Sequence, residues 1–108
     1  MITKEYLAQG SKIRVTFALP STVPADQISV VGDFSDWDPT LSMDRAQPSG
    51  NWELTLDLPT GRRYRFRYLI DGQHWLNDIF ADDHLENPYG SYDSVIDLRE
   101  SVRQRMKQ

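Results

Sequence analysis

The sequence contains no cysteine among its 108 residues. Disulfide bridges, thiolate metal sites and cysteine nucleophiles are therefore excluded. It also lacks an apolar run of about 18 residues, which is the length that a membrane-spanning helix needs. The N-terminal stretch MITKEYLAQGSKIRV lacks the apolar core of a secretory signal. From these absences we expect a cytoplasmic protein with no membrane partner.

Basic residues are in the minority. Lys and Arg number 12 against 16 Asp and Glu, and the net charge is −4. A nucleic-acid-binding surface usually needs an excess of Lys and Arg, because these side chains replace the counterions of the phosphates. The charge balance therefore argues against nucleic acid as a partner. Eight of the 12 basic residues are clustered, at Arg62, Arg63, Arg65, Arg67, Arg99, Arg103, Arg105 and Lys107.

Recognisable catalytic motifs are missing from the sequence. It has no GxSxG nucleophile turn and no glycine-rich phosphate loop. Carboxylates are plentiful in the turn-rich segments, but acid–base catalysis needs two of them at a set separation in a cleft. His74 and His84 stand in polar segments and are expected to be solvated. We therefore predict no catalytic residue, no metal and no cofactor.

Apolar and polar residues alternate in several short segments, as they do in half-buried β-strands. The clearest segment is residues 52–58, in which Trp52, Leu54 and Leu56 share one face. This pattern predicts that Trp52 belongs to the core. Asp71-Gly72 is a strong signal for a hairpin turn. The other expected strands are residues 12–19, 27–34, 62–70, 73–76 and 94–98.

No helical pattern separates these strands, so the sequence predicts a single all-β domain built as an antiparallel sandwich. Residues 35–50 and 77–93 are expected to be mostly loop. We place an N-terminal extension at 1–10, the sandwich at 11–98 and a tail at 99–108. In the tail Leu98, Val102 and Met106 are spaced by four, which predicts a short amphipathic helix or a frayed end.

Trp37 is placed unusually, inside the turn-prone and acidic stretch VVGDFSDWDPT, residues 30–40. So large an apolar side chain is normally buried. Two readings remain open from the residues alone. The ring folds back and caps one end of the sandwich, or its flat face is left open for a ligand. A sugar suits the second reading, because the C–H face of a pyranose packs on an aromatic ring.

Three motifs follow one another in an order that resembles a known family. GDFSDW is followed by YRFRYLIDGQHW and then by PYGSYDSVIDL. Together they resemble the family 48 carbohydrate-binding module, the glycogen- and starch-binding early set domain. This domain occurs at the N-terminus of isoamylases and branching enzymes and in the β subunit of AMP-activated protein kinase. The resemblance spans about residues 11–98 and implies an immunoglobulin-like sandwich that binds α-glucan without catalysis.

The resemblance also implies which residues touch the sugar. Two tryptophans cradle the glucan in the glycogen-binding members, and the matching positions here are Trp37 and Trp75. A basic residue on the strand before the hairpin bonds sugar hydroxyls, which assigns that role to Arg67. Tyr89 stands near the position of a bulky residue that wedges into the glucan helix. Binding members also have an asparagine before the last strand, and Asp93 occupies that place.

This chain departs from the family pattern at two positions. Asp93, or Ser94 if the loop shifts by one residue, replaces the asparagine. His74 is an extra hairpin residue between Gln73 and Trp75, so the orientation of the second tryptophan is left open.

Two functions of different kinds follow from the resemblance. The first is a noncatalytic module that binds glycogen or starch. The second is a protein-interaction or regulatory module that no longer binds sugar and serves a glycogen-metabolism enzyme or a kinase complex. The arginine strand and the basic tail favour the second. A glucan-active enzyme ranks last, because a sandwich of this size leaves no deep pocket for chemistry.

Overall fold

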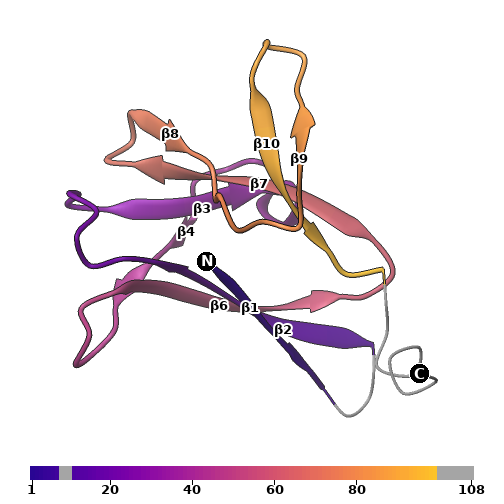
Figure 1. Ribbon diagram of the computed structural model, residues 1–108, viewed down its shortest axis with the longest axis horizontal. Coiled ribbons are helices and arrows are strands. Elements are labelled where there is room, and N and C mark those ends of the chain that lie inside the picture. Colours follow the sequence, from indigo (N-terminus) through magenta and orange to yellow (C-terminus); the bar gives the residue numbers. More distant parts are fainter. Residues whose placement is uncertain (8–10, 100–108) are drawn as a thin grey trace.

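A computed structural model describes residues 1–7 and 11–99. Its fold is a sandwich of two antiparallel sheets (Figure 1), which confirms the predicted fold class. The first sheet has the strand order β1-β2-β6-β5, and the second has the order β4-β3-β7-β10-β9 with β8 paired to β7. The strands are β1 (Ile2–Tyr6), β2 (Lys12–Leu19), β3 (Ile28–Gly32), β4 (Leu41–Ser42), β5 (Asp44–Arg45), β6 (Trp52–Pro59), β7 (Arg63–Ile70), β8 (His74–Leu76), β9 (Asp83–Glu86) and β10 (Tyr92–Asp97).

The core forms between the inward faces of the two sheets. Alternate residues of β2 and β7 are buried, as expected where one face of each strand packs on the opposite sheet. Phe17 of β2 and Phe66 of β7 meet across the layers with ring centroids 5.2 Å apart in an edge-on arrangement. Trp52 is only 5% exposed, so its predicted place in the core is confirmed.

The strand boundaries differ from the sequence prediction in particular places. The strand expected over residues 27–34 ends at Gly32, because the chain then turns into a short 3₁₀ helix, η1 (Asp33–Ser35). The segments expected to be mostly loop contain three short strands, β4, β5 and β9. Their pairing depends on neighbouring strands rather than on their own alternation, so periodicity did not reveal them.

The N-terminal extension also contains a strand that the sequence analysis did not predict. β1 pairs with β2 in a register that runs from Ile2 opposite Phe17 to Tyr6 opposite Ile13. It is therefore an edge strand of the first sheet. The helix or frayed end predicted for the tail lies outside the described residues.

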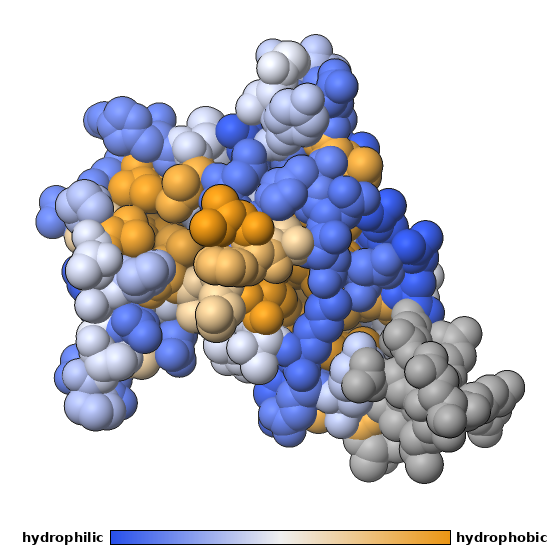
Figure 2. Space-filling model, viewed as in Figure 1, coloured by the Kyte–Doolittle hydropathy of each residue, from blue (hydrophilic) through white to orange (hydrophobic). Residues whose placement is uncertain are grey.

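Apolar side chains also gather on the surface, over β8 and the connection from β8 to β9 (Figure 2). Leu76, Ile79 and Phe80 are exposed here, next to the exposed Trp75, and we call these three residues the apolar patch. In the part of the chain that the structure describes, no helix has the length and apolar content needed to cross a membrane.

Candidate functional site

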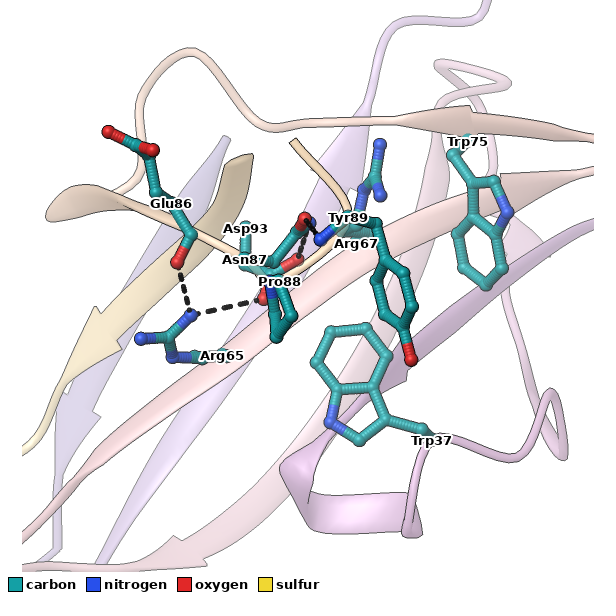
Figure 3. A pocket seen from close by; sticks show the side chains of 9 residues that line it. All are labelled: Trp37, Arg65, Arg67, Trp75, Glu86, Asn87, Pro88, Tyr89 and Asp93. Atoms are coloured by element: carbon teal, nitrogen blue, oxygen red, sulfur yellow. Dashed lines mark hydrogen bonds and ion pairs between the residues drawn. The ribbon is translucent and has the colours of Figure 1, made fainter. Parts of the chain in front are cut away.

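A groove of about 730 Å³ lies on the outer face of the second sheet (Figure 3). All five residues proposed from the sequence as sugar contacts line it. The lining residues are Trp37, Arg65, Arg67, Trp75, Glu86, Asn87, Pro88, Tyr89 and Asp93. They come from the turn after β3, from β7, from β8, from the end of β9, from the β9–β10 connection and from β10. The strand pairing β3–β7–β10 brings these separate stretches of chain together.

The turn after β3 explains how Trp37 comes to stand at the surface. Gly32 packs so closely on β7 that a Cβ atom there would lie 2.4 Å from the carbonyl oxygen of Arg65. Beyond η1, Asp36 and Trp37 adopt left-handed φ angles of 52° and 61°. The Trp37 amide donates back to the Gly32 carbonyl at 3.0 Å. This tight reversal leaves the Trp37 side chain 37% exposed beside the groove rather than buried as a cap.

Asp33 holds the indole of Trp37 at its polar edge. The Nε1–H of Trp37 donates to Asp33 Oδ1 at 3.0 Å. The other carboxylate oxygen, Oδ2, accepts from the backbone N–H of Arg65 at 2.8 Å. One carboxylate therefore joins the tryptophan to β7, the strand that forms the floor of the groove. The sequence analysis did not single out Asp33, although its position four residues before Trp37 in a tight turn was the available signal.

Trp75 reaches the same groove from the hairpin partner of β7. It pairs with Leu69, whose side chain alternates with the buried face of β7, so the ring lies on the outer face of the sheet. The Trp75 side chain is 46% exposed. The guanidinium carbon of Arg67 lies 5.5 Å from its ring centroid, within cation–π range. The Nε of Arg67 is buried and has no hydrogen-bond partner among the described residues.

Tyr89 is carried by the connection between β9 and β10. Its side chain is 91% exposed, and Figure 3 shows the ring reaching across the groove between Trp37 and Trp75. Asn87 shapes this connection, because its Oδ1 accepts from the backbone N–H groups of Tyr89 at 3.0 Å and Ser91 at 3.2 Å. The loop is therefore ordered locally while the Tyr89 ring stays open to solvent.

Asp93 also lines the groove, but its carboxylate already has protein partners. The residue is 6% exposed. One oxygen accepts from Asn87 Nδ2 at 3.2 Å, and the other lies 3.4 Å from an Arg65 terminal nitrogen. The same Arg65 nitrogen donates to the Glu86 carbonyl at 3.1 Å. In this arrangement Asp93 anchors the loop that carries Tyr89. Arg65 and Asn87 were missed as groove residues, although Arg65 shares the outward alternation of Arg67.

The arginines of β7 have partners within the chain. Arg63 pairs with Asp83 at 2.6 Å, and this ion pair lowers the pKa of Asp83. Arg65 pairs with Asp93, and Arg67 lies over Trp75. The outward arginine row is therefore largely engaged by neighbouring side chains of the same sheet. That weakens the sequence argument that it serves as a docking strip for another protein.

Other charged groups have structural roles in the described residues. Asp78 is buried and accepts a hydrogen bond from the Tyr68 hydroxyl at 2.7 Å and one from the Phe80 amide at 2.8 Å. Burial and this carboxylate raise the pKa of Tyr68. His84 contacts the Asp78 carbonyl through Nε2 at 2.7 Å. Within residues 1–7 and 11–99, no cluster of His, Asp and Glu is arranged to hold a metal ion.

Comparison with known proteins connects this groove to a family. A family model described as the glycogen recognition site of AMP-activated protein kinase matches residues 13–104. A search of curated proteins gives no match. The match covers the strands and loops that build the groove.

Solved structures with a similar fold belong to longer proteins. Ferric enterobactin esterase from Salmonella typhimurium aligns with a TM-score of 0.69 at 12% identity, over 90% of this chain and 34% of that chain. Enterobactin esterase from Shigella flexneri, in the presence of enterobactin, aligns with a TM-score of 0.67 at 13% identity, over 90% and 32%. The chain thus spans about a third of the length of these esterases. At this identity the likeness shows the fold alone.

Proposed function

The chain belongs to the family of the glycogen recognition site of AMP-activated protein kinase, and we propose that it binds α-glucan by stacking glucose rings on Trp37 and Trp75. Membership confirms the resemblance that the sequence motifs suggested. The proposed activity is binding alone, with no reaction carried out on the sugar.

The observation that carries this proposal is the pair of open indoles in one groove. Trp37 and Trp75 are 37% and 46% exposed, and both line the same cavity. Tryptophan is highly buried on average in folded proteins, and Trp52 of this chain is only 5% exposed. The C–H face of a glucose unit is a suitable cover for such rings, because it packs by dispersion and meets the negative face of the π system.

Polar groups at the edge of the groove would orient the sugar. Arg67 offers N–H donors to hydroxyl oxygens, and Tyr89 adds a third ring with a hydroxyl at its tip. Asp93 would act mainly through the loop it anchors. Because such an open groove buries little area, we expect a dissociation constant of about micromolar to millimolar. The ligand is uncharged, so added salt should leave the affinity unchanged.

Trp37→Ala and Trp75→Ala should each abolish retardation in a native gel that contains glycogen. Each variant removes a stacking surface while leaving the buried core in place, so the melting temperature should stay close to that of the unmodified protein. Phe80→Ala is the matched control, because Phe80 is 64% exposed and lies outside the groove. It should migrate as the unmodified protein does. Full retardation of the Trp37→Ala variant would refute the stacking proposal.

Arg67→Ala should weaken binding of maltoheptaose about tenfold, since a hydrogen bond from a charged donor is worth about 1.5 kcal/mol or more. Tryptophan fluorescence titration measures this affinity. The melting temperature should not change. Arg14→Ala serves as the control, because Arg14 pairs with Asp57 on the first sheet. Equal affinity in the Arg67 and Arg14 variants would remove Arg67 from the site.

Protein binding is a second candidate function, and the apolar patch of Leu76, Ile79 and Phe80 favours it. A partner such as an enzyme of glycogen metabolism would cover these side chains while the groove held glucan. The cytoplasmic location expected from the sequence stays a prediction, as does this partner. A module that binds protein alone would show no fluorescence change with maltoheptaose.

A further inference from the structure

Asp33 uses both carboxylate oxygens inside the turn that presents Trp37. Oδ1 accepts from the indole Nε1–H at 3.0 Å, and Oδ2 accepts from the Arg65 backbone N–H at 2.8 Å. Hydrogen bonds to an ionised acceptor are stronger than those between neutral groups. The indole is therefore restrained at its polar edge, while Trp37 remains 37% exposed and lines the groove.

Trp37 needs such a restraint because of where its backbone places it. Its left-handed φ of 61° directs the side chain out of a tight turn, and the ring has water on part of its surface. Without that bond, a partly exposed ring could sample more than one rotamer. Fixing a side chain before the ligand arrives removes part of the ordering cost of binding.

The second oxygen of Asp33 determines where the turn that carries Trp37 lies. Its bond to the Arg65 amide ties the turn to β7. The Arg65 side chain in turn contacts Asp93 and the Glu86 carbonyl, which belong to the opposite side of the groove. The ring of Trp37 and the loop of Tyr89 are thus held against the same segment of one strand.

We propose that Asp33 is a positioning residue for glucan binding, which holds the Trp37 indole in the orientation that stacks on the sugar. This inference rests on the proposed function. Asp33 itself meets the indole at its polar edge and touches no ligand in this role. Loss of its carboxylate should weaken binding about threefold to tenfold, the usual net worth of one hydrogen bond.

A double-mutant cycle separates this role from a general effect on the fold. Asp33→Ala is measured in the unmodified protein and in a Trp37→Phe background, where a ring remains but the Nε1 donor is gone. The bond to the Arg65 amide is lost equally in both. We expect maltoheptaose affinity to fall about threefold to tenfold in the first background and less than about twofold in the second. The affinity of Asp33→Asn, which keeps one acceptor oxygen, should lie between the affinities of Asp33→Ala and the unmodified protein.

The control removes an equal charge from the same loop. Asp38→Ala leaves the bond between Asp33 and Trp37 in place, so its affinity should match that of the unmodified protein. Equal losses for Asp33→Ala in both backgrounds, or no loss in either, would overturn the positioning role. It would also be overturned if Asp38→Ala weakened binding as much as Asp33→Ala.

A sugar-free readout keeps this test distinct from that of the proposed function. In a ¹H–¹⁵N NMR spectrum, the Trp37 Nε1–H should exchange faster with water in Asp33→Ala than in the unmodified protein. If Trp37→Ala still bound glycogen, the stacking proposal would fail, whereas the exchange rate would still report whether Asp33 holds the ring. Unchanged exchange would refute the restraint itself.

Discussion

Trp52→Ala is expected to lower the free energy of unfolding by about 3–5 kcal/mol, the range for truncating a buried aromatic residue. Trp52 is 5% exposed and pairs with Leu19 across β2 and β6. The guanidinium of Arg45 lies 4.1 Å from its ring centroid and would lose that contact. Urea denaturation followed by circular dichroism measures the loss. An unfolding curve with the original midpoint would contradict the assignment of Trp52 to the core.

Trp52→Phe is the matched control for this prediction. The Nε1 of Trp52 is buried without a hydrogen-bond partner in the described part of the chain. Phenylalanine keeps an aromatic ring and removes an unpaired donor, so part of the cost of lost volume is offset. We expect a loss of less than about 1.5 kcal/mol. Glycogen retardation should survive, because Trp52 belongs to the first sheet and the groove belongs to the second.

Gly32→Ala is expected to cost about 1–3 kcal/mol of stability and to abolish glycogen retardation as well. The new Cβ would lie 2.4 Å from the Arg65 carbonyl oxygen and 2.8 Å from Phe66 Cβ. Gly32 has an extended φ of −173°, so the penalty is steric and not conformational. The clash has to push β3 away from β7, and the turn that carries Trp37 moves with it. Urea denaturation and the glycogen gel together measure both losses.

Gly61→Ala is the control that separates the loss of stability from the loss of glycogen binding. Gly61 has a left-handed φ of 92°, and a Cβ there would meet nothing within 4 Å. Its replacement should cost about 1 kcal/mol through backbone strain and leave glycogen binding unchanged. If Gly32→Ala bound glycogen normally at a temperature where it is folded, the contact between the turn and β7 would not control the groove.

Alternation was a sufficient guide to the long strands. The period-two pattern of β2, β6 and β7 predicted three buried faces, and the structure confirms those of β2 and β7. On β6 Trp52 is buried as predicted, whereas Leu54 and Leu56 are only partly buried. The short strands β4, β5 and β9 carry too few residues for a pattern to emerge. β1 was missed for a related reason, because it is short and none of its five residues is fully buried at the edge of the sheet.

The chain's own residues determined which side chains point outward along β7 and that Trp37 stands in a sharp turn, because both follow from local periodicity and turn chemistry. Only the tertiary structure decided that Trp37, Trp75 and Tyr89 share one groove. These residues lie in the turn after β3, in β8 and in the β9–β10 connection, and their relative positions depend on the pairing of β3, β7, β8 and β10. The same folding turned the Asp93 carboxylate toward Asn87 and Arg65. Contacts between distant segments set both outcomes, and no local pattern encodes them.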